Sequence, residues 1–133
     1  MIAMAPAPRL DILSPAECQR LLRSRSVGRI AVNRRGLGPL VVPVNYAVDE
    51  DGAVVFRTGE GTKLARITRG AVSFQVDAFD DHDRSGWSVL VAGLAHEVDA
   101  CTGTAALVDP WTAGPLRRAV RIVPTTVTGR WLR

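Results

Sequence analysis

The spacing of hydrophobic and polar positions predicts short β-strands over most of the chain. The predicted strands are rich in β-branched residues, are bounded by turn residues and span residues 27–32, 40–48, 53–58, 71–76, 86–98, 121–123 and 127–132. The run Asp49–Gly52 predicts a hairpin turn, because glycine readily adopts the positive φ that such a turn needs. Glycines and prolines in residues 100–116 predict a loop with at most a turn of helix.

Two short helices interrupt this strand pattern. Ser14 and Glu17 have the spacing of a capping box with proline between them, which predicts a helix to about Arg23. Thr62 is a suitable N-cap for a second helix over residues 63–67. Many short strands joined by hairpin-length links indicate a mainly β antiparallel barrel with short flanking helices. We expect residues 1–13 to be a flexible arm, or a strand that orders only against a neighbour, and residues 14–133 to be a single domain.

Composition fits one domain without a nucleic-acid partner. The 133 residues are 47% hydrophobic, which is enough for one sizeable core. The net charge of +4 arises from 17 basic residues scattered among 13 acidic ones, so no basic stripe for nucleic acid is present. Arg117, Arg118 and Arg121 form the one local cluster, which is typical of a solvated face.

Cysteines, histidines and hydropathy exclude further classes. Cys18 and Cys101 are far apart and lack metal-ligand spacing, which indicates reduced thiols in the core. His82 and His96 are too few for an ordinary zinc or haem site, so we expect no metal. No stretch of about 18 apolar residues is present. We therefore expect a cytoplasmic protein without a membrane partner.

The segment from Phe56 to Leu64 carries the chemistry of an anion site. A strand ends in Arg57 and Thr58, a loop with two glycines follows, and the predicted helix opens on Thr62 and Lys63. Cations and exposed amides at a helix start favour a phosphate. Glycine turns before helices are common, however, and a solvated Lys63 remains the alternative that spacing alone leaves open.

Several segments in order along the chain resemble the pyridoxamine 5'-phosphate oxidase-like family. They are Val41–Val48, Phe56–Thr58, Gly61–Leu64, Ser85–Val91 and Gly129–Arg130, and the resemblance covers nearly the whole chain from Ser14 onward. The resemblance implies a six-stranded split β-barrel of Greek-key type. It also implies a homodimer that binds FMN, or in some branches a deazaflavin coenzyme, in two clefts across the subunit interface.

The resemblance also assigns cofactor-binding residues. It implies that the phosphate is held by Arg57, Thr58, Thr62 and Lys63. It further implies that the isoalloxazine lies along Pro43, Val44 and Asn45. Trp87 and Ser88 would then face the isoalloxazine from the sheet, and Arg130 of the partner subunit would lie near the ring. Separately, Trp111 stands in a glycine- and proline-rich loop, where we expect it to cover either the partner chain or the flavin.

Two departures from the family leave the substrate open. Arg57 stands where the nitroimidazole-reductase branch usually has histidine, and residues 123–133 lack the arginine–histidine pair of the vitamin-oxidase branch. We expect an FMN-dependent oxidoreductase acting on an unidentified small molecule, without a catalytic side chain of its own. The alternative is a non-catalytic module that binds flavin, deazaflavin or haem.

FMN is favoured over the deazaflavin because the basic groups of the anion site are concentrated at one point. Arg57, Lys63 and Arg66 all lie on one short segment, with no second cluster beside it to hold an extended anionic tail. The fold could still bring Arg117, Arg118 and Arg121 to the cleft mouth. The deazaflavin therefore remains the alternative cofactor.

Overall fold

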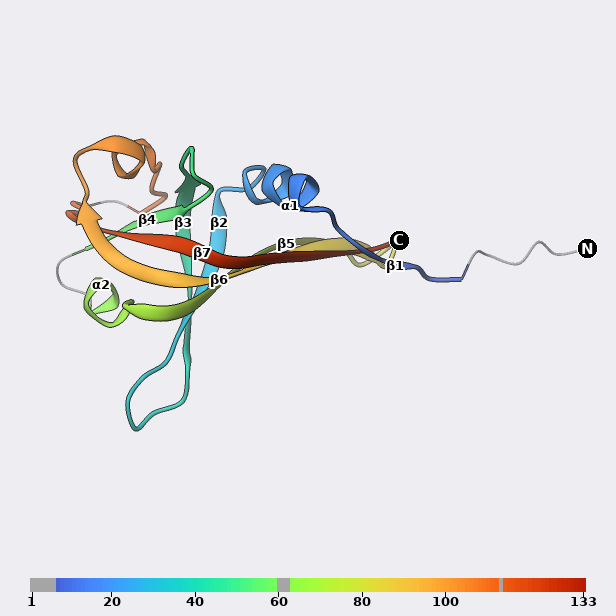
Figure 1. Ribbon diagram of the computed structural model, residues 1–133, viewed down its shortest axis with the longest axis horizontal. Helices are drawn as coiled ribbons and strands as arrows, with labels where there is room; N and C mark the ends of the chain where they lie inside the picture. Colours follow the sequence, from blue (N-terminus) through green and yellow to red (C-terminus); the bar gives the residue numbers. More distant parts are fainter. Residues whose placement is uncertain (1–6, 60–62, 113) are drawn as a thin grey trace, which may run out of the picture.

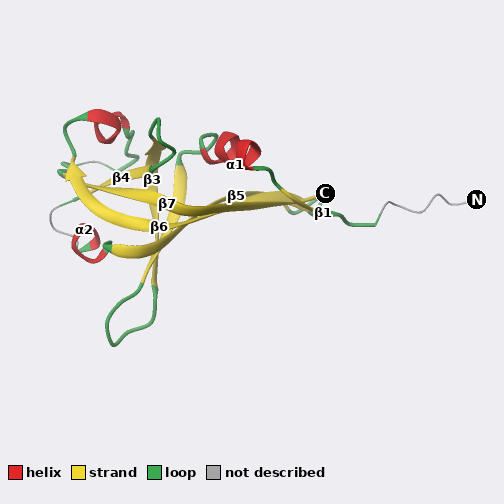
Figure 2. Cartoon of the chain, in the orientation of Figure 1, coloured by secondary structure: helices red, strands yellow, loops and turns green. Residues whose placement is uncertain are grey.

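Six antiparallel strands close into a barrel in the computed structural model, which describes residues 7–59, 63–112 and 114–133 (Figures 1 and 2). The elements are β1 (Leu10–Ile12), α1 (Pro15–Leu22), β2 (Val27–Val32), β3 (Leu40–Val48), β4 (Val54–Thr58), α2 (Leu64–Ile67), β5 (Gly70–Asp80), β6 (Ser85–Asp99), the 3-10 turn η1 (Gly103–Leu107) and β7 (Arg118–Leu132). The mainly β barrel with short flanking helices that the sequence predicts is confirmed.

The strand order around the barrel is β7-β4-β3-β2-β5-β6, and pairing of β6 with β7 closes the ring. Strands β2, β3 and β4 form a meander, after which the chain returns to place β5 beside β2, as in a Greek key. Strand β1 adds to the outer end of β7, so the described part of the N-terminal arm lies beside the C-terminus (Figure 1). No helix of the described residues is long and apolar enough to cross a membrane.

Helix α1 forms as its sequence predicts and covers part of the barrel. The Glu17 amide donates to Ser14 Oγ at 3.2 Å, and the Ser14 amide donates to Glu17 Oε1 at 3.4 Å, which completes the capping box. Cys18, Leu21 and Leu22 share the buried face of the helix and join the barrel core. The prediction of core thiols is therefore confirmed for Cys18 but was wrong for Cys101, which is exposed in the turn after β6. The helix therefore fixes the start of β2, which follows it directly.

The barrel interior is filled by alternate residues of every strand. The largest fully buried side chains on the strands are Ile30, Val54, Phe56, Phe74, Val76, Val89, Val91, Val120 and Ile122. Tyr46 meets Phe74 edge-on, with ring centroids 4.9 Å apart. The interior therefore holds a packed core, and ligands must bind on the outer face or at the rim.

The prediction of two separate final strands around Pro124 was wrong, because β7 runs unbroken from Arg118 to Leu132. The pairing shifts register where Ala92 faces Thr126 and Gly93 faces Pro124, which leaves one extra residue on β7. Such a bulge removes the need for a proline amide in the ladder. A Cβ on Gly93 would lie 2.3 Å from the Val123 carbonyl oxygen, so glycine permits this close approach.

Strand β5 is also longer than the sequence predicts. It extends to Asp80, so that Asp77 and Asp80 belong to the strand instead of lying beyond its predicted end at residue 76. This part of β5 is supported on one side, since the strand pairs with β6 over its full length but with β2 only as far as Gln75. Asp77 is thereby held on the same surface as residues of β2.

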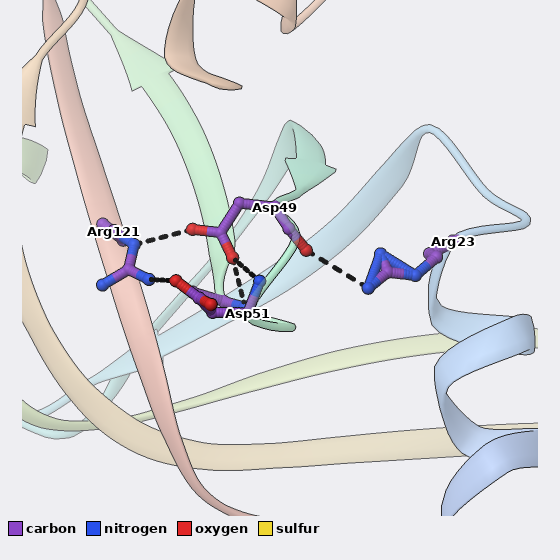
Figure 3. Close-up of polar contacts among 5 residues, drawn as sticks. Arg23, Asp49, Asp51 and Arg121 are labelled. Carbon is purple, nitrogen blue, oxygen red and sulfur yellow. Dashed lines mark hydrogen bonds and ion pairs between the residues drawn. The ribbon is translucent and has the colours of Figure 1, made fainter. Parts of the chain in front are cut away.

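The turn between β3 and β4 is stabilised by Asp49 (Figure 3). Its Oδ1 accepts from the Asp51 and Ala53 amides, each at 2.9 Å, and its Oδ2 accepts from Arg121 Nε at 2.7 Å. The Asp49 carbonyl accepts from Arg23 at 3.2 Å. Burial raises the pKa of Asp49, but the Arg121 guanidinium and the two amides lower it more, so the pKa lies below its ordinary value of 3.8.

We predict that Asp49→Asn lowers the free energy of unfolding by about 1–2 kcal/mol at pH 7. A carboxyl whose pKa is depressed in the folded state stabilises the fold above its unfolded pKa, and this contribution disappears as pH falls through the folded pKa. Urea unfolding at pH 7 and at about pH 3 should therefore show the difference between wild type and variant shrinking in acid.

Asp51→Asn is the matched control, because the Asp51 side chain is 85% exposed and lies 3.4 Å from Arg121. It should change stability little at either pH. A difference for Asp49→Asn that is equally large at both pH values would show that the carboxylate charge is not what stabilises the turn.

Candidate functional site

A pocket of about 280 Å³ opens on the outer face of the barrel between β3, β4 and the loop that precedes β7. We call it the Arg57 pocket. It is lined by Val42, Pro43, Val44, Asn45, Arg57, Thr58, Gly59, Leu64, Val108, Pro110, Thr112 and Leu116. Five residues proposed from the sequence as flavin ligands therefore lie together, namely Pro43, Val44, Asn45, Arg57 and Thr58.

An unpaired strand edge forms one wall of the Arg57 pocket. Pairing of β3 with β4 ends at Tyr46 and Phe56, so no other described strand lies along this edge of β3 before Tyr46. The Tyr46 amide donates to Ser26 on the β2 side. Because amides alternate in direction along a strand, the Asn45 amide and the Pro43 carbonyl point toward the unpaired edge. Proline has no amide hydrogen, but an amide at position 43 would point toward the unpaired edge, so Pro43 removes no hydrogen bond between β2 and β3.

Arg57 and Thr58 form the polar end of the pocket. The Arg57 guanidinium donates from Nε and Nη2 to the Leu116 carbonyl, at 3.0 and 2.6 Å. These bonds fix the plane of the guanidinium and leave further N–H groups able to donate to an anion. Thr58 is buried beside it. The strand end predicted to meet a phosphate thus holds a fixed cation at the pocket.

The helix that follows forms where the sequence predicts it but begins one residue later. Helix α2 is a single turn, Leu64–Ile67, whose N-cap position is Lys63 without a side-chain cap. Thr62, the predicted N-cap and phosphate ligand, lies outside the described residues. Lys63 is exposed and is not among the residues lining the pocket. A one-turn helix aligns few peptide dipoles, so the charge of Lys63 matters more here than the helix itself.

The side chain of Asn45 connects three segments around the pocket. Its Nδ2 donates to the Ser26 carbonyl at 3.2 Å, and its Oδ1 accepts from the Trp111 amide at 2.8 Å. Both ends of the amide are therefore engaged, and the loop carrying Trp111 is tied to β3. The Trp111 side chain itself is 72% exposed.

Three other predicted ligands lie away from the Arg57 pocket of the same chain. Trp87 is buried in the barrel core, with the Arg25 guanidinium 5.9 Å from its ring centroid. Ser88 pairs with Asp77 on one side and with Arg130 on the other. Ser88 and Arg130 are thus neighbours across β6 and β7; β2 and β5 lie between β6 and β3 on one side of the barrel, and β4 lies between β7 and β3 on the other.

Two of the three arginines in the basic cluster near the start of β7 form ion pairs. Arg118 donates to both Glu97 oxygens, at 2.6 and 2.7 Å, and Arg121 pairs with Asp49. Neither arginine lines the Arg57 pocket. The interpretation of this cluster as part of an ordinary surface is therefore supported, and it does not supply a second cationic group at the pocket.

Sequence reasoning missed a second group of cations, Arg25 and Arg29. They line a pocket of about 370 Å³ together with Ser24, Ser26, Val27, Asp77 and Trp111, which we call the Trp111 pocket. The run Arg23–Ser24–Arg25–Ser26 between α1 and β2 was the available signal, because it combines guanidinium and hydroxyl groups in a short connection.

The lining of the Arg57 pocket offers no group suited to proton transfer. The only phenol of the chain, Tyr46, lies behind the pocket, donates to the Leu22 carbonyl and has its pKa raised to about 12 by burial. It is therefore a neutral hydrogen-bond donor in the core. Among the described residues, no cluster of histidine, cysteine or carboxylate side chains could hold a metal ion.

Comparison with known proteins agrees with this architecture. The protein Rv0080 of Mycobacterium tuberculosis is 37% identical over 122 residues, which cover 85% of this chain and 79% of that protein. An FAD-binding protein from Mycobacterium smegmatis superposes with a TM-score of 0.73 at 35% identity, covering 94% of this chain and all of that one. An FAD-binding protein from Mesorhizobium loti gives 0.78 at 26% identity, with 96% and 99% covered.

The family profile described as pyridoxamine 5'-phosphate oxidase matches residues 14–131. This span begins at the N-cap of α1, includes all six barrel strands and both lined pockets, and ends within the last strand. The chain therefore belongs to the pyridoxamine 5'-phosphate oxidase family.

Proposed function

We propose that the chain binds a flavin nucleotide, FMN in the simplest case, in the Arg57 pocket and uses it to oxidise or reduce a small molecule. The observation that carries the proposal is the combination of an unpaired β3 edge with a fixed arginine at one end of the pocket. A flavin needs both features, because its ring presents hydrogen-bonding atoms along one edge and its ribityl chain ends in a phosphate.

The residues of the pocket fit the two ends of such a ligand. The Asn45 amide and the Pro43 carbonyl offer one donor and one acceptor to the ring. Arg57 and Thr58 offer donors to the phosphate, with Lys63 on the neighbouring turn adding a second positive charge. The FAD-binding relatives from M. smegmatis and M. loti support a flavin as the ligand class.

FMN is the proposed form because the phosphate-binding groups are concentrated at one end of the pocket. The deazaflavin with its acidic tail would need a further cationic surface, and the arginines near the start of β7 are already paired with Glu97 and Asp49. FAD, the ligand named for the two relatives, contains an FMN moiety, and we propose that this moiety would occupy the same pocket.

A second copy of the chain is part of the proposal. The Arg57 pocket is slightly smaller than the roughly 300–1,000 Å³ of ordinary small-molecule sites, so one chain encloses only part of a flavin. The outer face of the barrel carries exposed Val41, Leu90 and Leu94, beside a groove of about 520 Å³ lined largely by small residues. We propose that a homodimer covers this face and brings Ser88 and Arg130 of one subunit to the flavin of the other.

The chain's own residues then act by position and charge. A bound flavin supplies hydride or electron transfer, so no acid or base side chain is required. Arg57 would hold the phosphate, the β3 edge would orient the ring, and the Val108–Thr112 loop would restrict water access. The described residues that line the Arg57 pocket include no histidine, cysteine, tyrosine or carboxylate, which is compatible with this chemistry.

The proposal predicts that the purified protein carries, or takes up, a flavin with visible absorption. Reduction by a chemical reductant should bleach this absorption, and cycling with candidate electron acceptors should restore it faster than buffer with oxygen alone. A flavin that is bound but exchanges no electrons with any acceptor would favour the non-catalytic binding module. Absence of flavin binding would overturn the proposal.

We predict that Lys63→Ala weakens FMN binding by about 1.5–3 kcal/mol, or roughly 10- to 150-fold, through lost phosphate neutralisation. Riboflavin, which lacks the phosphate, should bind variant and wild type alike in a fluorescence titration. Arg20→Ala removes an exposed cation on α1 and serves as the control, with no effect on either ligand. An equal loss for riboflavin would mean that Lys63 acts on the ring or on the fold.

We predict a dimer in sedimentation analysis at micromolar protein concentration. Leu94→Glu should produce monomers that lose flavin affinity but keep the melting temperature of a folded chain, because Leu94 is 58% exposed in the single subunit. Wild-type protein that sediments only as a monomer would contradict the proposed assembly.

A further inference from the structure

The Trp111 pocket has the chemistry of a site for an aromatic anion. It presents two guanidinium groups, Arg25 and Arg29, the hydroxyls of Ser24 and Ser26, and one carboxylate, Asp77. Arg29 lies 3.4 Å from Asp77, whereas Arg25 forms no ion pair with any carboxylate of the described residues. The pocket therefore carries a net positive charge that its own side chains leave uncompensated.

Trp111 is held in place although its side chain is exposed. Its amide donates to Asn45 Oδ1 at 2.8 Å, and the same Asn45 side chain donates from Nδ2 to Ser26 at 3.2 Å. One asparagine thus ties Trp111 to the Ser24–Arg29 segment that forms the opposite wall. A large indole that is 72% exposed leaves apolar surface in water, and a planar ligand stacked on it would remove that cost.

The two pockets are neighbours on the barrel surface. On β3, Pro43 and Asn45 line the Arg57 pocket, and their partners on β2, Arg29 and Val27, line the Trp111 pocket. Paired strands lie about 4.8 Å apart, so a ligand group leaving the first pocket enters the second within one strand spacing. The loop separates them, since its Pro110 and Thr112 line the first pocket and Trp111 the second.

We propose that the Trp111 pocket is a subsite for a planar ring that carries a phosphate or carboxylate. Trp111 stacks on the ring, Arg25 and Arg29 meet the anionic group, and Asn45 is a positioning residue that holds Trp111. The role of this subsite in turnover rests on the proposed function, but its binding chemistry does not. The aromatic anion is either the adenylate end of a flavin dinucleotide or a separate reactant.

Binding of adenosine 5'-monophosphate to the full chain tests the proposal. We expect calorimetric titration to give saturable binding that Trp111→Leu and Arg25→Gln each weaken at least about fivefold. Adenosine without phosphate should bind more weakly than the monophosphate to wild type, and Arg25→Gln should remove that difference. Arg69→Gln is the control, because Arg69 precedes β5 at the end away from Asp77 and lies outside the pocket.

Comparison of FAD with FMN distinguishes the two sources of the aromatic anion. If the group belongs to the cofactor, FAD binds more tightly than FMN, and both variants remove the advantage. If it is a separate reactant, FAD gains nothing over FMN, and the FMN-loaded protein still binds the monophosphate.

Two results separate this proposal from the proposed function. Monophosphate binding that depends on Trp111 and Arg25, in a protein that binds no flavin, would support the subsite and overturn the flavin proposal. Flavin binding with no monophosphate binding, and with FAD and FMN of equal affinity in wild type and both variants, would overturn the subsite alone.

Discussion

The divergence of β4 from β3 is the constraint on which the candidate site depends. Strand β4 pairs with β3 over three residues only, Tyr46–Val48, but with β7 over all five of its own. Two strands that separate in this way leave an edge of backbone polar groups, which a buried structure must satisfy by other means. Arg57 stands on the part of β4 that has left β3, and it is held against the loop before β7. The site is therefore a consequence of how the barrel closes.

Closure itself depends on the long β6–β7 ladder, which runs from Gly86 to Asp99 with one register shift. Without the extra residue opposite Gly93, Pro124 would interrupt this ladder in its middle. The bulge allows one strand of fifteen residues, β7, to pair with both β4 and β6. The same strand begins beside the pocket, because it follows the loop whose Leu116 carbonyl accepts from Arg57.

Local signals in the sequence predicted local structure well. The capping box at Ser14, the β3 boundaries and the turn at Gly52, which has φ of +80°, are all confirmed. The break expected at Pro124 was wrong because proline is tolerated through a bulge that depends on Gly93, some thirty residues earlier. The residues next to Pro124 in the sequence do not indicate this bulge, since the register is a property of two paired strands and not of either strand alone.

The difference between local sequence signals and the pairing of distant strands also explains how much of the site could be predicted. Pro43, Asn45, Arg57 and Thr58 converge because they lie on strands joined by one hairpin, which the sequence shows directly. Arg25 and Arg29 reach the same surface only through the pairing of β2 with β3, and nothing in their own segment indicates what they will face.

The distribution of ion pairs separates the cations that stabilise the fold from those available to a ligand. Arg118 and Arg121, which lie three residues apart and form a conspicuous cluster with Arg117, form ion pairs with Glu97 and Asp49. Arg25 is a less conspicuous arginine that lines the Trp111 pocket. No carboxylate of the described residues lies within ion-pair range of its guanidinium, because Asp77 pairs with Arg29. A charge that a carboxylate neutralises contributes to stability, whereas one that has only an aromatic neighbour, as Arg25 has in Trp87, contributes potential that an anion can use. Density of arginine in the sequence is therefore a poor guide to a binding site, and the pairing of each guanidinium in the fold is the better one.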